Sequence, residues 1–144
     1  MTLSRQLRQL TDDEDGSTLP LILGYMLLAV AVIFVCVCAT DLYIAQKRLD
    51  SLADAASLAG ADGFTLQVAG DGVQAELTDD GVREQAEAVV AAVAQDARIV
   101  SAGTPDGVSA RVTVASLWHP PLFSPFVPDG VPLEATATTR TALR

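Results

Sequence analysis

The side chains that could support catalysis are few and poorly matched. The chain contains a single histidine, His119, and the serines nearest to it in sequence are Ser116 and Ser124. A histidine that acts as a general base needs a nucleophile within hydrogen-bond reach and a third group that orients its ring. Neither serine stands in the glycine-flanked turn that exposes the nucleophile of many hydrolases. The sequence therefore predicts no nucleophilic catalysis at His119.

Metal and phosphate sites are not indicated either. One imidazole without a nearby cysteine or a matched carboxylate motif does not make up a set of metal ligands. Two glycine pairs lack the other residues of a phosphate-binding fingerprint: Gly70 and Gly72, and Gly103 and Gly107. We expect a protein that is not an enzyme, with no cofactor, no metal ion and no small-molecule substrate.

The most informative segment is apolar and lies near the N-terminus. Residues 16–40 contain no charged side chain, and residues 19–38 are almost entirely apolar. At a rise of about 1.5 Å per residue, a helix of this length covers a hydrocarbon core of about 30 Å. Its branched and aromatic residues together favour insertion by on the order of 4–7 kcal/mol. The segment predicts one membrane-spanning helix.

A cleaved secretory signal is the alternative for this segment. Such a signal has a shorter apolar region that ends at a small-residue cleavage site. Here the helical pattern continues without a break into residues 41–46, so we favour a membrane anchor. Cys36 and Cys38 lie inside the apolar run, and on a helix their side chains point apart and cannot form a disulfide with each other.

Length and charge limit the remaining possibilities. A chain of 144 residues has room for one membrane helix and one small domain of about 85–100 residues. The net charge of −9 argues against nucleic acid as a partner, because a phosphate-binding face needs clustered cations. Arg5 and Arg8 precede the apolar run, and Lys47 and Arg48 follow it. Because two cations stand on each side of the apolar run, the positive-inside rule does not decide the orientation.

The helical pattern continues beyond the apolar run, and we expect one helix over residues 18–59. Leu42, Ala45, Leu49, Leu52, Ala56 and Ala59 follow each other at alternating steps of three and four, which is typical of a coiled-coil type of contact. We call these six residues, together with the adjacent Ala53, the helix seam. Its partner is either the chain's own domain or the helix of a neighbouring subunit. Off the seam, Lys47 can pair with Asp50, and we expect Gly60 or Gly63 to end the helix in a left-handed conformation.

The rest of the chain alternates between strand and helix patterns. Residues 64–68 and 73–77 predict a hairpin, Thr78 is a candidate N-cap for a helix over residues 81–100, and residues 108–115 and 133–140 predict further strands. The apolar stripe of that helix consists of Val82, Ala86, Val89, Val90, Val93 and Ala97. We therefore expect an α+β fold in which a long N-terminal helix, transmembrane and then extramembrane, precedes a small domain of about four strands packed with one amphipathic helix. The expected divisions are a polar tail (1–17), the helix (18–60) and the domain (61–144).

A proline-rich segment, residues 118–132, separates the last two predicted strands. Its five prolines exclude regular structure and make a stiff loop. Trp118, Phe123 and Phe126 give the loop an aromatic character. Such a loop is a candidate contact with a partner or a membrane surface. The alternative is that the three rings fold back as a lid over a small core.

Two segments resemble a known family. They are Gly16-Ser17-Thr18-Leu19-Pro20 at the start of the helix and the run Arg48-Leu49-x-x-x-Ala53-Asp54-Ala55-Ala56-x-Leu58-Ala59. Both resemble the TadE/TadG-like Flp pilus-assembly family, and more narrowly its short TadG-like members in actinobacteria. The resemblance implies an accessory or minor pilin-like subunit of a Tad secretion system, anchored in the cell membrane by a single pass. It also implies a cytoplasmic N-terminus, an extracytoplasmic C-terminal domain, and the membrane and other subunits of the machine as partners.

The resemblance also raises the question of processing. A prepilin peptidase site has a glycine before the cleaved bond, and Gly16 followed by Ser17 is the candidate. Pilins usually carry a glutamate five residues beyond that glycine, whereas this chain has Leu21. We therefore expect the whole chain to be retained as an anchor, with cleavage after Gly16 as the alternative. The alternative function is a single-pass anchored binding module that uses residues 118–132 to hold another envelope protein or the cell wall.

Overall fold

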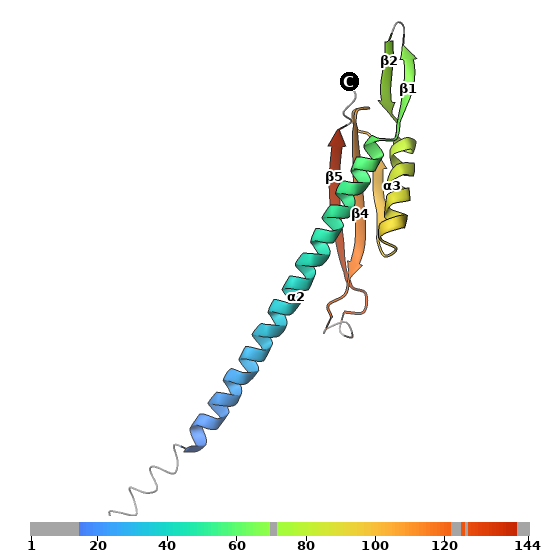
Figure 1. The fold of residues 1–144 in the computed structure, drawn as a ribbon. Coiled ribbons are helices and arrows are strands. Elements are labelled where there is room, and N and C mark those ends of the chain that lie inside the picture. Colours follow the sequence, from blue (N-terminus) through green and yellow to red (C-terminus); the bar gives the residue numbers. More distant parts are fainter. Residues whose placement is uncertain (1–14, 70–71, 122–124, 126, 141–144) are drawn as a thin grey trace, which may run out of the picture. The chain divides into compact units, whose positions relative to one another are not determined.

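The computed structural model describes residues 15–69, 72–121, 125 and 127–140. The chain forms two compact units, Met1–Thr40 and Asp41–Arg144, which are considered one at a time. Its elements (Figure 1) are α2 (Asp15–Ala61), β1 (Phe64–Ala69), β2 (Gly72–Leu77), α3 (Asp79–Val93), β3 (Arg98–Gly103), β4 (Ser109–Trp118) and β5 (Val131–Arg140). The expected α+β class, with a long N-terminal helix before a small mixed domain, is confirmed.

In the first unit, α2 exposes apolar side chains on every side. Leu19 is 69% exposed, Leu27 64% and Ile33 61%. The hydroxyl of Thr40 donates a hydrogen bond of 2.8 Å to the carbonyl oxygen of Cys36, so this polar group is satisfied within the helix, as a hydrocarbon environment requires. Among the described residues, this is the one helix long and apolar enough to cross a membrane.

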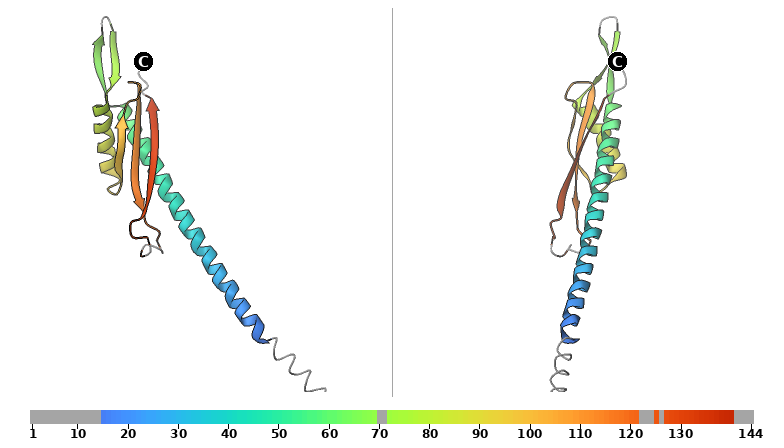
Figure 2. Two further views of the ribbon diagram at one scale, coloured as in Figure 1. Left: turned by 180° about the vertical axis from the view of Figure 1, so that it is seen from behind. Right: turned by 90° about the vertical axis from the view of Figure 1, so that its left-hand side faces the viewer.

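The second unit packs helices on one face of a sheet. Strands β3, β4 and β5 form an antiparallel sheet in the order β3-β4-β5, and α3 and residues 41–61 of α2 lie on the same face of it (Figure 2). Alternate residues of β4 (Ala110, Val112 and Val114) are fully buried against the helices, as the period of two in a strand requires. The other face is polar, and the Thr113 and Thr136 hydroxyls lie 2.8 Å apart on it.

The junction between α2 and α3 depends on glycine. A Cβ on Gly81 would lie 2.5 Å from the carbonyl oxygen of Gly63, a distance at which the backbone would have to move. The Thr78 hydroxyl accepts a 3.2 Å hydrogen bond from the Gly81 amide, which confirms the predicted N-cap of this helix. The predicted hairpin is also confirmed, because β1 pairs with β2 from Phe64↔Leu77 to Ala69↔Gly72.

The prediction of a helix over residues 81–100 is wrong in its C-terminal part. Helix α3 ends at Val93, and β3 (Arg98–Gly103) is a fifth strand that the helical stripe concealed. Val93 is 70% exposed, and Ala97 lies outside the helix, although its side chain is half-buried against the core. Pairing with β4 satisfies the backbone hydrogen-bonding groups of β3. If these residues were helical instead, that edge of β4 would have no strand paired with it.

Two further expectations are corrected. Trp118 ends β4 and Pro132 lies in β5, paired with Leu117, so the irregular segment is shorter than predicted. Because β5 is an edge strand, a residue without an amide hydrogen is tolerated there.

No left-handed glycine ends α2, since the described glycines with positive φ are Gly107 and Gly130. The glycines near residue 61 serve close packing instead.

Candidate docking groove

The structure places the helix seam against the chain's own sheet. Leu49, Leu52, Ala53 and Ala56 are 4%, 5%, 1% and 0% exposed, and they belong to the core of the second unit. Leu42, Ala45 and Ala59 are half-buried. Of the two partners left open by the sequence, the chain's own domain covers the seam in this structure. A contact of the seam with a neighbouring subunit stays a prediction.

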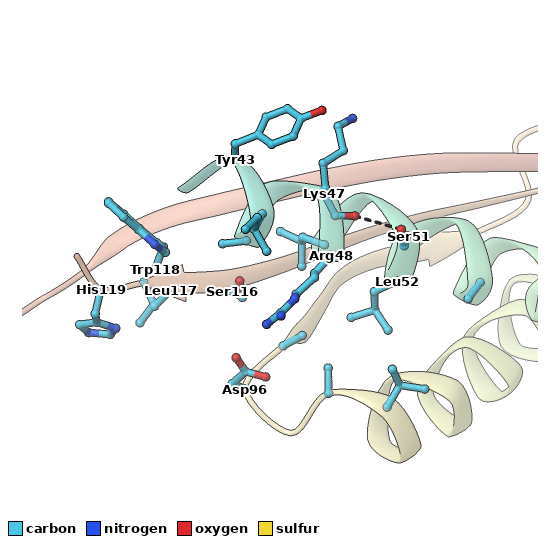
Figure 3. Close-up of a pocket in the computed structure, with 17 residues that line it drawn as sticks. Tyr43, Lys47, Arg48, Ser51, Leu52, Asp96, Ser116, Leu117, Trp118 and His119 are labelled. Atoms are coloured by element: carbon cyan, nitrogen blue, oxygen red, sulfur yellow. Dashed lines mark hydrogen bonds between the residues drawn. The ribbon is translucent and has the colours of Figure 1, made fainter. Parts of the chain in front are cut away.

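The exposed side of this helical segment lines a groove of about 720 Å³. Three parts of the second unit form its walls: α2, the end of α3 with the segment that follows it, and the end of β4 (Figure 3). Residues from α2 include Ile44, Arg48, Ser51 and Ala55, and those from the other walls include Val93, Asp96, Ser116 and Leu117. Ser51 and Ala55 are small and exposed, and small side chains let an approaching helix come close to the backbone that carries them.

Polar contacts fix the side chains next to the groove. The Lys47 ammonium and the Asp50 carboxylate form an ion pair of 3.1 Å, which confirms the pairing expected from their spacing. The Gln46 amide donates to the same carboxylate at 3.0 Å and to the Glu134 carbonyl oxygen at 3.1 Å, which links α2 to β5. The Gln46 and Lys47 hydrogen bonds lower the pKa of Asp50, and the hydrogen bond to Asp50 raises the pKa of Lys47.

Arg48 is the cation that remains available in the groove. Among the described residues, the ion pair of Lys47 with Asp50 is the one salt bridge. The Arg48 guanidinium extends into the groove on the side of Asp96 (Figure 3), without a bond to it. A guanidinium offers several donors in a rigid fork that suits a carboxylate. The groove thus combines apolar walls with one donor group for an acidic side chain.

The candidate loop residues are only partly placed. Trp118 is half-buried against the core, and its indole Nε1 donates a hydrogen bond of 2.7 Å to Asp41 Oδ2, so this ring folds back onto α2. Phe123 and Phe126 lie outside the described residues. Gly16 and Ser17 lie in the first turn of α2, and their cleavage stays a prediction.

The groove brings His119 and Ser116 to one surface. His119 is exposed and Ser116 half-buried. Among the described side chains, no hydrogen bond joins the two, and no three histidine, cysteine or acidic side chains come together. Ser124 lies outside the described residues.

Sequence reasoning missed this groove because it extended the second helix too far. If the helix continued to residue 100, residues 94–97 would be helical. In the structure they turn back after α3 and form one wall of the groove. Asp96 was the available signal, because a charged residue interrupts the apolar stripe just before Ala97.

The comparisons with known proteins bear on α2. Residues 16–63 match the model of the TadE/G-like Flp pilus-assembly family. The match confirms the resemblance over this third of the chain, and the narrower likeness to short TadG-like members stays a prediction. No curated protein and no solved structure matches the chain.

Proposed function

We propose that this protein is a membrane-anchored accessory or minor pilin-like subunit of a Tad/Flp pilus assembly and secretion system. The observation that carries the proposal is the family match over residues 16–63, because it supports a role in pilus assembly. The matched segment contains the whole apolar run and the helix seam. Such a subunit acts through helix packing and protein contacts rather than by catalysis.

The proposed topology follows the family and the apolar helix. Residues 1–17 form a cytoplasmic tail, residues 18–60 the helix with its single membrane pass, and residues 61–144 an extracytoplasmic domain. The absence of charge in residues 16–40 and the exposure of their apolar side chains support the anchor. The partners are the membrane and other subunits of the pilus machine.

We further propose that the groove receives a helix of a neighbouring subunit. One wall of the groove, from Tyr43 to Ala55, lies within the segment that matches the family model. Its exposed small residues permit close helix approach. Arg48 favours a partner that carries a carboxylate at the contact. The seam residues support this contact indirectly, because they hold α2 against the sheet.

A matched pair of substitutions tests the groove. Ala55→Phe fills the groove from an exposed position, whereas Ala88→Phe adds the same ring to an exposed position of α3 outside it. We expect Ala55→Phe to abolish or strongly reduce filament assembly and Ala88→Phe to leave it normal. Both variants should retain the thermal midpoint of the parent. Normal assembly of the Ala55 variant would overturn the groove contact.

Intact mass measurement tests the anchor and the processing site. The native chain is isolated separately from membranes and from sheared surface filaments. Full-length protein confined to membranes supports an uncleaved accessory subunit. A species that begins at Ser17 in the filament fraction supports a processed minor pilin, and full-length protein in the soluble fraction contradicts the anchor.

The alternative is a single-pass anchored binding module for another envelope protein or the cell wall. The 720 Å³ groove with its available guanidinium favours a bound partner without specifying a pilus subunit. A photo-crosslinking residue in place of Ser51 distinguishes the two functions. Crosslinks to pilus or secretion subunits support the first, and crosslinks to an unrelated envelope protein or to the cell wall support the second.

A further inference from the structure

The exposed surface of α2 in the second unit carries opposite charges on its two flanks. Arg48 lines the groove, whereas Asp54 stands outside the set of residues that line it. Both side chains are exposed. At about 100° per residue, the six positions between them correspond to a separation of about 120° around the helix axis. Ser51, which is small and exposed, lies midway between the two charges, three residues from each.

An exposed leucine accompanies the carboxylate. Leu58 is 58% exposed and follows Asp54 by one turn, so the two side chains lie on the same flank of α2. Among the helical residues of the second unit, Asp54 is the one exposed carboxylate that an exposed leucine follows at this spacing. We call Asp54 and Leu58 the acidic flank. In the part of the chain that the structure describes, Asp54 forms no salt bridge.

The groove contains groups that match the acidic flank. The Arg48 guanidinium offers a rigid fork of donors for a carboxylate. One turn from Arg48 in either direction, an apolar residue of α2 lines the groove, Ile44 on one side and Leu52 on the other. A helix whose Asp54 bonds to Arg48 therefore has an apolar contact for its Leu58, whichever way it runs along the groove.

One segment of α2 thus carries both halves of a contact. The groove and the acidic flank lie on different sides of the helix, so one copy of the chain can provide the groove while a second provides the flank. Opposite charges then meet at the contact, whereas a contact between two copies of Arg48 would bring like charges together. A surface that is complementary to another surface of the same chain is what self-assembly requires.

We propose that the helix in the groove is α2 of a second copy of this chain, with Asp54 of that copy bonded to Arg48 and its Leu58 against the apolar wall. This inference rests on the proposed contact between the groove and a neighbouring helix, and it names the partner. The protein then assembles with itself through a segment that matches the family model.

Photo-crosslinking in the full-length chain tests the identity of the partner. A copy with a photo-crosslinking residue in place of Ser51 is produced together with an epitope-tagged full-length copy, and the membranes are irradiated. We expect an adduct of two chains that carries the tag, and peptide mapping should place the attachment near Asp54 of the tagged copy. The same photo-crosslinking residue in place of Ala88, at an exposed position of α3 outside the groove, should give no such adduct.

The other outcomes separate this inference from the proposed function. An adduct from Ser51 with a different subunit of the pilus machine, and none with the tagged copy, would overturn the inference while the groove contact stands. If Ser51 gives no adduct with any protein, the groove contact and the inference both fail. A two-chain adduct attached far from Asp54 and Leu58 would also overturn the inference, because another surface then occupies the groove.

Exchange of the two charges tests the pairing itself. Arg48→Glu and Asp54→Arg should each reduce the yield of the two-chain adduct by about tenfold or more, the scale measured for close charge pairs at interfaces. The double variant Arg48→Glu/Asp54→Arg should recover most of the yield, because the opposite charges meet again. Arg83→Glu makes the same change of net charge at an exposed residue of α3 outside the groove and should leave the yield unchanged.

Thermal melts accompany the charge variants. Both residues are exposed, so each variant should retain the thermal midpoint of the parent, and the change in yield then reports on the contact rather than on the fold. Recovery in the double variant supports the pair of Arg48 with Asp54. Loss in both single variants without recovery in the double variant would overturn the pairing.

Discussion

Residues 19–38 and 42–59 of α2 share one helical geometry but have different surroundings. In the first segment apolar side chains are exposed all around the helix. In the second, one face is buried, with Ala53 and Ala56 at 1% and 0% exposure. A sequence rich in small and apolar residues therefore produces two kinds of surface, one suited to lipid and one to a sheet.

The comparison shows that exposure alone does not identify the surrounding medium. Leu27 and Leu58 are 64% and 58% exposed, yet their neighbours differ. Leu27 lies in a segment without charge, whereas Leu58 stands between Asp54 and Asp62. The arrangement of charge along the helix predicts lipid around the first leucine and water around the second.

The largest expected effect comes from the same charge at these two leucines. Leu27→Lys should make membrane insertion less favourable by about 3–4 kcal/mol, because an ammonium in the hydrocarbon replaces an apolar side chain. Leu58→Lys should change neither insertion nor stability by more than about 0.5 kcal/mol. The inserted fraction in a translocation assay measures the first effect. Equal behaviour of the two variants would show that both leucines face the same medium.

A larger side chain should affect residues 42–59 and leave residues 19–38 unaffected, which is the reverse of the effect expected from an added charge. Ala56→Leu should destabilise the second unit by about 1–3 kcal/mol, because a fully buried position has no space for the larger side chain. Ala29→Leu should leave that stability unchanged, since Ala29 is exposed in the apolar run. Denaturant unfolding followed by Trp118 emission checks both. Because Ala56→Leu acts on the fold, its effect on assembly would not by itself reveal a contact between subunits.

A smaller effect is expected where the second segment bonds to the sheet. The hydroxyls of Ser57 and Thr139 lie 2.7 Å apart, and Ser57 is fully buried. Ser57→Ala should therefore cost about 1 kcal/mol of unfolding free energy. The exposed Ser51, whose hydroxyl donates to the Lys47 carbonyl oxygen, provides the control. A cost for Ser51→Ala equal to that for Ser57→Ala would contradict the role assigned to the buried bond.

The smallest effect concerns acid, which should act on the second unit and not on the apolar run. The Asp106 carboxylate accepts hydrogen bonds from the Val108 amide, at 3.1 Å, and from the amide and hydroxyl of Ser109. These bonds lower its pKa, the Val108 amide most strongly. A lowered pKa in the folded state means that the stabilisation is present at neutral pH and is lost as the pH falls through the folded pKa.

Thermal melts at several pH values check this expectation. Asp106→Ala should lower the midpoint at neutral pH, and its difference from the parent should shrink below the ordinary range of aspartate. A difference that stays constant down to the most acidic pH would show that the carboxylate charge contributes nothing. Residues 16–40 carry no charged group, so the apolar helix itself should show no change over this range.

Local patterns in the sequence were sufficient for most elements. The apolar run, the hairpin and the Thr78 cap depend on side chains that are neighbours in the chain, and each was predicted correctly. Strand β3 was missed because no glycine or proline stands between Val93 and Arg98 to mark the end of the helix. Helix α3 stops there because the next residues pair with β4, a partner distant in sequence.

The sequence by itself determined the apolar helix, the α+β class and the likeness to a pilus-assembly family, because these follow from periodicity and residue order. Only the tertiary structure decided what the helix seam packs against, where Trp118 bonds and which residues line the groove. These features depend on side chains far apart in sequence, such as Asp41 with Trp118 and Ser57 with Thr139. A one-dimensional pattern specifies that a face is apolar, and the folded sheet specifies what covers it.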